Sequence, residues 1–257
     1  MLKRYHFNVA IITIGLAFVA YGCLDTNTGI GEDSNQFVSQ AAPGGSAQVF
    51  LNDSSFTNLE IEIDYMPGHQ PSQQGLDSLK SFLLERLNKS EIVIQTPSEV
   101  QSGGGGTYSA AEIRVFEEEY RDNYTDSREN TLYAYMLIVD GRSQEQDNVL
   151  GITYYNTSMA FFGESFNEAS SGIGTPSKAM VEGTVFQHEF GHTLGLVGAG
   201  SPTQSEHKTA GGAHCTVEGC LMESTVETTN YFFNLFGGSI PELGEQCIAD
   251  LQANGGQ

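Results

Sequence analysis

The chain has 257 residues, with 32 aspartates and glutamates against 11 lysines and arginines, and its formal net charge is −21. A surface this acidic repels phosphate groups, which argues against nucleic acid and anionic membrane surfaces as partners. It instead favours basic segments of a peptide or protein as substrate. The length that remains after an N-terminal leader suits one domain or two closely packed subdomains, and we expect a monomer.

The N-terminus has the features of an export signal. Lys3 and Arg4 precede an apolar run over residues 9–20, which has the length of a signal-peptide core and is short for a membrane span. The residues directly before Cys23 resemble a bacterial lipoprotein cleavage site. We therefore predict a signal peptide over residues 1–22 and a lipid on Cys23. An ordinary signal peptide cut nearby or an uncleaved anchor is the alternative.

The predicted lipid places the protein outside the cytoplasm, on the periplasmic or cell-surface face of a bacterial membrane, and it is the only membrane attachment we expect. Residues 23–46 are rich in small polar and acidic residues, a composition that cannot bury a core and is typical of a flexible tether. We divide the globular part into an N-terminal subdomain over residues 47–195 and a C-terminal subdomain over residues 196–257.

Hydrophobic periodicity over the N-terminal subdomain predicts an α/β fold. Polar and apolar residues alternate over residues 58–65, as in a half-buried strand, and the apolar residues of 72–87 recur at helical spacing. By the same criteria we predict strands at 91–96 and 132–139, a turn at 102–106, a helix at 109–120, and a hairpin formed by 149–155 and 158–162.

Two further helices are expected towards the C-terminus. One begins with Thr175 as its cap and Pro176 in its first turn. It ends at Gly195, since glycine adopts the left-handed conformation of a helix end at little cost. The other follows Ser239, whose spacing to Glu242 is that of a capping box.

The segment from His188 to Gly195 reads HExxHxxG and carries the strongest chemical signal of the chain. Residues four apart on a helix lie on the same face, so His188 and His192 can bind one zinc ion through their ring nitrogens. Glu189 points to the edge of that face, where its carboxylate can take a proton from a water on the metal. The pattern therefore predicts a hydrolytic zinc site.

A second cluster follows this motif and reads His214-Cys215-x4-Cys220-x-Met222. Together the two segments resemble the metzincin metallopeptidases. The archaemetzincin pattern, in which the third histidine is followed at once by this cysteine and methionine tail, is the most similar. Here residues 196–213 would be an insertion between the glycine and the third ligand.

The resemblance covers residues 188–222 and implies a fold as well as a site. A metzincin-like fold has a mixed, twisted sheet with helices in its N-terminal subdomain and an active-site helix. Its small, irregular C-terminal subdomain contains a tight turn, with Met222 beneath the metal, and a terminal helix. Residues 159–163 would then be the strand that borders the substrate cleft, with an ordinary edge strand as the alternative.

The third metal ligand is a choice between two histidines. In metzincins it falls three residues after the glycine, but that position here is Gly198, which has no side chain. The archaemetzincin-like tail favours His214. His207 lies within the insertion, where a solvated loop residue is the alternative interpretation. A glutamate ligand would have to be Glu206, Glu218 or Glu223.

Three cysteines follow Cys23, namely Cys215, Cys220 and Cys247. Archaemetzincins bind a second, structural zinc through the first two positions and a later Cys-x-x-Cys pair, of which this chain keeps only Cys247. A four-cysteine zinc site therefore cannot form, and we expect one catalytic zinc ion. We predict a disulfide between Cys215 and Cys220, with free thiols or pairing to Cys247 as the alternatives.

The resemblance implies a zinc-dependent endopeptidase that hydrolyses a peptide or protein substrate through a zinc-bound water activated by Glu189. The metal ligands would be His188, His192 and His214. The alternative is a catalytically inactive surface-binding lipoprotein that retains the metal site. A degenerate site would be expected to lose Glu189 first, so its presence favours the enzyme.

Overall fold

The structure, a computed structural model, describes residues 37–234 and 238–257. The predicted signal peptide, the predicted lipidation site Cys23 and most of the predicted tether lie outside these residues. Within the part of the chain that is described, no helix is both long enough and apolar enough to cross a membrane. The elements are α1 (Ala47–Leu51), β1 (Asn58–Tyr65), α2 (Gln73–Arg86), β2 (Glu91–Ile94), β3 (Ser98–Glu99), β4 (Gly106–Tyr108), α3 (Ala110–Tyr120), β5 (Thr131–Val139), β6 (Gly141–Ser143), β7 (Gly151–Tyr155), β8 (Ser158–Phe162), α4 (Gly163–Ser170), α5 (Lys178–Thr193), a 3₁₀ turn η1 (Leu196–Gly198), α6 (Thr229–Asn234) and α7 (Glu245–Ala253).

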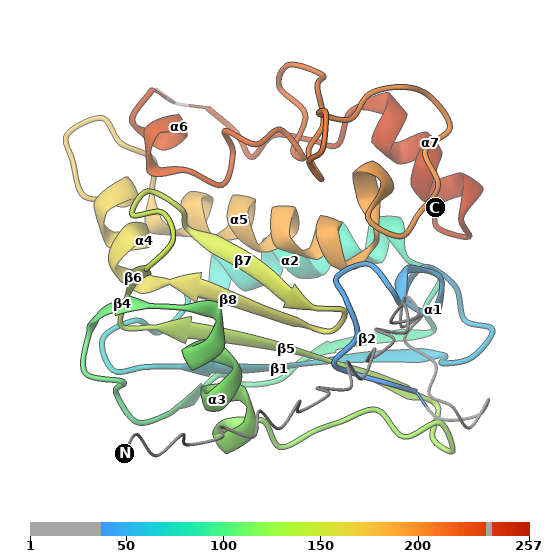
Figure 1. The fold of residues 1–257 in the computed structure, drawn as a ribbon, viewed down its shortest axis with the longest axis horizontal. Helices are drawn as coiled ribbons and strands as arrows, with labels where there is room; N and C mark the ends of the chain where they lie inside the picture. Colours follow the sequence, from blue (N-terminus) through green and yellow to red (C-terminus); the bar gives the residue numbers. More distant parts are fainter. Residues whose placement is uncertain (1–36, 235–237) are drawn as a thin grey trace, which may run out of the picture.

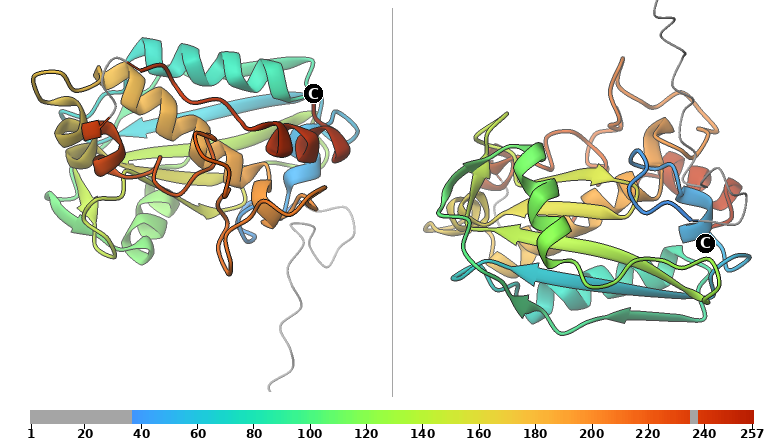
Figure 2. Two further views of the ribbon diagram at one scale, coloured as in Figure 1. Left: turned by 90° about the horizontal axis from the view of Figure 1, so that it is seen from above. Right: turned by 60° about the horizontal axis from the view of Figure 1, so that its bottom comes forward.

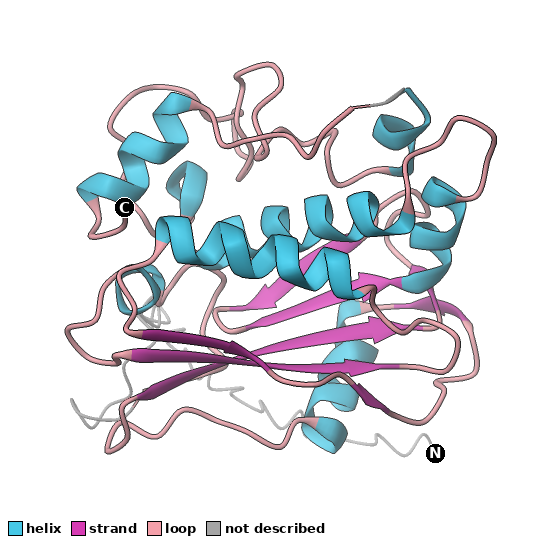
Figure 3. Cartoon of the chain, turned by 180° about the vertical axis from the view of Figure 1, so that it is seen from behind, coloured by secondary structure: helices cyan, strands magenta, loops and turns pink. Residues whose placement is uncertain are grey.

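A twisted sheet with helices on both faces forms the body of the protein. Its strand order is β2-β1-β5-β8-β7, with β3 beside β1, and all pairs are parallel except β7 with β8. Helices α2 and α5 run side by side along one face of the sheet (Figures 1 and 3). Helix α3 crosses the opposite face, and the C-terminal segment lies over α5 (Figure 2). The predicted α/β fold with a mixed sheet is confirmed.

The two faces of the central strand β5 supply the two parts of the core. Leu132, Met136 and Ile138 pack beneath α2 and α5, whereas Tyr135 and Leu137 pack on the side of α3. This alternation follows from the period of two along a strand. All five side chains are fully buried, and burial of each contributes on the order of 1.5–3 kcal/mol.

Several predicted elements match the structure closely because their end signals are local. Strand β1 spans the predicted residues 58–65. Ser72 caps α2 by accepting a hydrogen bond from the Gly75 amide. Ser109 and Glu112 form a capping box at the start of α3. Short polar caps of this kind satisfy the free amides of a first helical turn, and they can be read from sequence.

The helix that carries the motif begins later than predicted. Ser177 caps α5 by accepting from the Met180 amide at 3.3 Å, so Pro176 precedes the helix rather than lying in its first turn. The Thr175 hydroxyl instead donates to the Gly172 carbonyl in the preceding turn. At the other end, Gly195 adopts a φ of 72° directly after the helix, as predicted.

The predicted capping box of the last helix is wrong. Helix α7 begins at Glu245 after Gly244, without a side-chain cap. The carbonyl of Glu242 accepts a hydrogen bond from the Leu221 amide at 2.8 Å, which ties the segment before α7 to the turn that contains Met222. A tertiary backbone contact therefore outweighs the local helix-start signal of Ser239. Helices α1, α4 and α6 were not expected, since all three are short.

The strand expected to border the substrate cleft also differs from the prediction. Strand β8 lies between β5 and β7 and all of its residues are buried, while Gly163 already begins α4. Because the hairpin folds back antiparallel to β8, β7 becomes the outermost strand on this side of the sheet. The border of any cleft here is therefore formed by β7. The division of the globular part at residue 195 stays a prediction, and core residues from both sides of it pack together.

The turn after α5 gives a test of the fold. At Gly195 an added Cβ would lie 2.5 Å from the Ser201 amide nitrogen, and φ is also left-handed. We expect Gly195→Ala to lower the free energy of unfolding by about 2–5 kcal/mol, measured by urea denaturation, because backbone strain and overpacking add. Gly68→Ala is the control, since Gly68 has a φ of 85° with open space around it and should cost only about 1–2 kcal/mol. Equal losses would contradict the close packing at Gly195.

Candidate metal centre

Helix α5 brings the HExxH side chains into a buried environment. Every residue from Val181 to Thr193 is buried, including His188, Glu189 and His192. Ionisable groups are rarely buried without a partner, because removal from water is costly for a charged or polar group. The partners of these three side chains therefore define the site.

Four side chains place ligand atoms close together at the C-terminal half of α5. They are His188, His192, His214 and Glu227, whose nearest nitrogen and oxygen atoms all lie within 4.8 Å of one another. The ring centroids of the three histidines are 4.9–5.4 Å apart. The structure thus places His214 beside the helical pair, whereas His207 lies in a separate cluster.

The orientation of His188 is fixed by the turn that contains Met222. Its Nδ1 donates to the carbonyl oxygen of Leu221 at 2.7 Å, so in the neutral imidazole the lone pair is on Nε2 and faces the cluster. Met222 lies against the same helix, since a Cβ added at Gly191 would be 2.2 Å from its sulfur. Glycine at position 191 therefore lets the methionine approach α5 between the two motif histidines.

Protonation of His192 is suppressed by its surroundings. Burial, together with the neighbouring His188 and His214, lowers its pKa well below the usual value. A neutral imidazole is the form that binds metal. The Nε2 atoms of His188 and His192 are only 3.2 Å apart, a separation at which two lone pairs repel unless a proton or a cation lies between them.

Glu189 lies beside the histidines but is held by a different partner. Thr153 on β7 has its hydroxyl 2.8 Å from Glu189 Oε2, and also 2.8 Å from the backbone carbonyl of the same residue. The other carboxylate oxygen, Oε1, is buried and has no hydrogen-bond partner. Burial raises the pKa of Glu189 to about 7, against the lowering effect of His188. A carboxyl group with this pKa can both accept and return a proton near neutral pH.

The donor set fits a zinc ion. Three histidine nitrogens and an adjacent carboxylate that does not join the donor cluster are the side chains of a hydrolytic zinc site. His214 Nε2 and Glu189 Oε1 are both buried without a hydrogen bond, as expected of atoms that face a metal ion and its water. The chemistry of the residues present therefore agrees with the expected metal.

Sequence reasoning missed Glu227. Its Oε2 lies 3.5 Å from His188 Nε2 and 3.5 Å from His214 Nε2. The two histidines lower the pKa of this carboxyl far below its usual range, outweighing the effect of burial. Glu227 belongs to no helical motif and follows the methionine by five residues, so no periodic signal marks it. Only the pairing of its backbone with residues 148–150 brings it to the site.

A cavity of about 580 Å³ opens beside the histidines and offers room for a ligand. Strand β7 forms one wall through Gly151–Tyr154, and Glu189, His192, His214 and Glu227 form its floor. Arg114 contributes the only basic side chain among the residues that line it, against three glutamates. The cavity therefore joins the candidate metal ligands to the outermost strand of the sheet.

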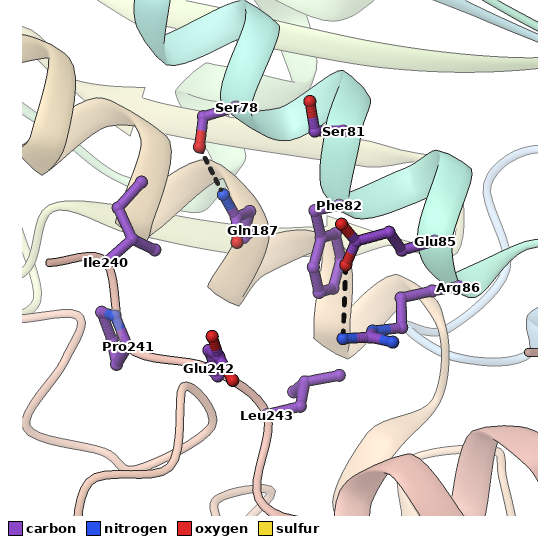
Figure 4. Close-up of a pocket in the computed structure, with 10 residues that line it drawn as sticks. All are labelled: Ser78, Ser81, Phe82, Glu85, Arg86, Gln187, Ile240, Pro241, Glu242 and Leu243. Atoms are coloured by element: carbon purple, nitrogen blue, oxygen red, sulfur yellow. Dashed lines mark hydrogen bonds and ion pairs between the residues drawn. The ribbon is translucent and has the colours of Figure 1, made fainter.

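A smaller cavity of about 290 Å³ lies between α2, α5 and the segment before α7. In it Ser78 accepts from the Gln187 amide at 2.9 Å, and Arg86 lies 3.5 Å from Glu85 (Figure 4). None of the ten residues that line it is a histidine or a cysteine. It shares no residue with the four-residue donor cluster and is not part of the candidate centre.

The expected disulfide between Cys215 and Cys220 is not formed in the structure, where all three described cysteines are thiols. The Cys220 sulfur is instead 3.7 Å from the Cys247 sulfur, which is 3.7 Å from His207 Nε2. His207 is 3% exposed and Asp250 lies 3.2 Å from the same ring nitrogen, so His207 is not a solvated loop residue. The loop that contains His207 therefore packs this side chain against Cys247 and Asp250 of α7.

Backbone amides point at two of these sulfur atoms. The Val217 amide donates to Cys215 Sγ at 3.4 Å, and the Gly244 amide donates to Cys220 Sγ at 3.2 Å. The hydrogen bond from Cys247 lowers the pKa of the Cys220 thiol to about 5. This environment stabilises the Cys220 thiolate, which is the form that binds metal, whereas burial raises the pKa of Cys215, and the hydrogen bond with Cys220 together with burial raises the pKa of Cys247.

Comparison with known proteins gives distant structural similarity. No model of a protein family matches the chain, and no curated protein matches it. Among solved structures it is similar to an archaemetzincin from Methanopyrus kandleri, with a TM-score of 0.49 and 16% identity over 78% of this chain and 96% of that one. It is also similar to metalloproteinase-II from Bacteroides fragilis, with a TM-score of 0.44 and 14% identity over 90% of this chain and 61% of that one. At such identities function has to be argued from the residues of the site.

The state of the cysteines can be measured directly. We expect Cys215, Cys220 and Cys247 all to be alkylated when the protein is denatured with a chelator and without reductant, because the structure holds them as thiols. Peptide mapping by mass spectrometry would locate the alkyl groups, with a fully reduced sample as control. Two cysteines that resist alkylation and are found in one cross-linked peptide would show that a disulfide is present and would contradict this prediction.

Proposed function

We propose that the protein is a zinc-dependent peptidase, with His188, His192 and His214 as the metal ligands and Glu189 as the general base. The observation that carries the proposal is the buried Glu189 carboxylate, whose Oε1 has no hydrogen-bond partner, on the helix that supplies two of three histidines whose nitrogens converge. When bound there, zinc would act as a Lewis acid towards a peptide carbonyl and lower the pKa of water to about 7.

The side chains around the metal ligands have separate roles in this proposal. Thr153 orients Glu189 by its hydrogen bond to Oε2, which leaves Oε1 to take a proton from water and return it to the leaving amine. The carbonyl of Leu221 holds His188 in the tautomer that offers Nε2. Met222 packs against Gly191 and so fixes the distance between its turn and helix α5.

The cleft suits an extended peptide. Strand β7 is outermost in the strand order and lines the cavity, so a substrate can add to the sheet along it and reach the histidines. The lining glutamates Glu145, Glu189 and Glu227 outnumber the single Arg114. Together with the net charge of −21, they favour substrates that carry basic side chains.

A binding protein without hydrolysis is the second candidate, and one observation favours it. A catalytic zinc site keeps one position open for water, whereas a closed site with four protein ligands is structural. The carboxylate of Glu227 lies close enough to the histidine nitrogens to supply a fourth donor. The proposal of a peptidase therefore requires that Glu227 can give way to water or substrate.

We also propose a second, structural zinc, held by His207, Cys215 and Cys247, whose ligand atoms all lie within 4.8 Å of one another, and completed by Cys220, which lies near Cys247 but outside that group. For tetrahedral zinc the expected separation is about 3.8 Å between two sulfurs and about 3.6 Å between a sulfur and a nitrogen. The Cys220–Cys247 and Cys247–His207 separations of 3.7 Å agree with these values. The histidine would take the place of the missing fourth cysteine, which changes the expected metal content from one ion to two.

The cellular setting is proposed from the sequence alone. The signal-peptide and lipoprotein features of residues 1–23 support a protein that is exported and tethered to a membrane through a lipid on Cys23. A peptide or protein outside the cytoplasm would then be its substrate, and the acidic surface disfavours nucleic acid. We propose a monomer.

The general base can be tested by Glu189→Gln. The amide keeps the shape of the side chain and cannot accept the proton, so peptide hydrolysis should fall by about 10²-fold or more while zinc content is unchanged. Activity on a peptide library and metal analysis of the same sample would be compared with Glu206→Gln, an exposed glutamate in the loop after α5. A mutant as active as the wild type would show that Glu189 is not the base.

The two histidines of the C-terminal segment should lose different metal ions. We expect about two zinc ions per chain in the wild type and about one in each of His214→Ala and His207→Ala, because each histidine belongs to a different cluster. His214→Ala should abolish hydrolysis. His207→Ala should instead lower the thermal stability, because it exposes a closed site that ties α7 to the turn. One zinc in the wild type, retained by His207→Ala, would leave the cysteines without a metal.

A further inference from the structure

The carboxylate of Glu227 occupies a defined position relative to the histidines, and this inference rests on the zinc site proposed above. Its Oε2 is 3.5 Å from both His188 Nε2 and His214 Nε2, while His188 Nε2 is 3.2 Å from His192 Nε2. Ligands of tetrahedral zinc at 2.0–2.1 Å are about 3.3–3.4 Å apart. These three separations are close to the distance between neighbouring corners of such a tetrahedron, and the remaining pairs of donor atoms lie within 4.8 Å.

The backbone around Glu227 holds the side chain in this position. The Leu150 amide donates to the Glu227 carbonyl at 2.9 Å, and the Thr229 amide donates to the Asn148 carbonyl at 2.9 Å. Val149 and Thr228 form an antiparallel bridge between these two bonds. Glu227 is therefore placed by a short two-stranded pairing rather than by a free loop.

The other glutamate of the site has a different environment. Glu189 is buried and accepts a hydrogen bond from the Thr153 hydroxyl, and it does not belong to the four-residue donor cluster. The Glu227 side chain is 21% exposed and lines the cavity, so water and ligands reach it from one side. One carboxylate thus suits proton transfer from inside the protein, and the other suits direct contact with the metal from the cleft.

We infer that Glu227 is a fourth protein ligand of the metal, filling the position that a hydrolytic site leaves to water, and that substrate or water has to displace it. In the resting state the site is closed by three imidazoles and one carboxylate. The carboxylate also neutralises part of the charge of the ion, which three neutral imidazoles leave uncompensated. A ligand that binds the metal from the cleft therefore competes with Glu227.

Competition of this kind predicts opposite changes in two affinities. Loss of Glu227 removes a donor, which weakens zinc binding, and removes a competitor, which strengthens the binding of an external ligand. A side chain that acted only as a hydrogen-bond or charge partner of the histidines would lower the affinity for zinc without strengthening the binding of the external ligand. The two affinities measured together therefore separate the two roles.

The test uses full-length protein and acetohydroxamate, a small chelator that binds zinc through two oxygens. Its affinity for the zinc-loaded protein is measured by calorimetry, and the zinc affinity by competition with a chromophoric chelator. We expect Glu227→Ala to bind acetohydroxamate about tenfold or more tightly than the wild type and zinc about tenfold or more weakly. Glu227→Gln keeps the shape of the side chain and should shift both in the same directions by smaller factors.

Glu223→Gln is the matched control. Glu223 lies on the same segment, and its carboxylate accepts from the Gly219 amide rather than facing the histidines, so neither affinity should change. Unchanged acetohydroxamate affinity in both Glu227 variants would overturn the inference, whether zinc affinity falls or not. Absence of zinc binding by the wild type would instead contradict the proposed function, so failures of the two proposals are distinguishable.

Discussion

A helix buried along most of its length has to carry two imidazoles and a carboxylate, and much of the surrounding structure follows from this constraint. Each polar atom on α5 needs a partner, because an unsatisfied buried group costs on the order of 1–3 kcal/mol. The Leu221 carbonyl serves His188 Nδ1, and the Thr153 hydroxyl serves Glu189 Oε2. Glu189 Oε1 is buried without a partner, as are the hydroxyls of Thr184 and Thr193 on the same helix. The hydrogen bonds thus fix the orientations of His188 and Glu189, while Glu189 Oε1 and His214 Nε2 stay unpaired and are available to the proposed metal ion and its water.

The two clusters share one stretch of backbone, which links their stabilities. His214 and Cys215 are adjacent, and the Cys215 amide donates to the Met222 carbonyl at 2.7 Å, while the Thr209 amide donates to the His214 carbonyl at 2.9 Å. A metal on the sulfur cluster would tie this stretch to α7 through Cys247 and so reduce the entropy lost when His214 meets the helical histidines. The insertion between the glycine and the third ligand is then not a free loop. It contributes His207 to one cluster while it delivers His214 to the other.

Sequence patterns predicted the elements that depend on local signals and missed those that depend on tertiary pairing. The alternation of residues 58–65 gave β1 its bounds, and the caps Ser72 and Ser109 marked α2 and α3 because a cap is bonded within one turn. The signal at Ser239 failed since Glu242 is bonded to Leu221, more than twenty residues away in sequence. At the site, the HExxH spacing was enough to predict His188, Glu189 and His192. The environment of His207 and the position of Glu227 depend instead on contacts between segments that are distant in sequence. Hydrophobic periodicity gives no information about such tertiary contacts.

The two clusters differ in whether water can replace one of their side chains at a metal ion. The buried sulfurs of Cys215 and Cys220 accept hydrogen bonds from backbone amides and are shielded from solvent, so a metal held by them would be structural. The Glu227 carboxylate lines the cavity, so water could replace it at a metal ion. The metal would then lose one protein donor, and the released carboxylate would be hydrated. The pairing that holds Glu227 reaches Asn148 and Leu150, which lead directly into β7, the strand available to a peptide. In the proposed site, a substrate that shifted β7 would act on the hydrogen bonds that position Glu227, so binding in the cleft and opening of the site would be coupled.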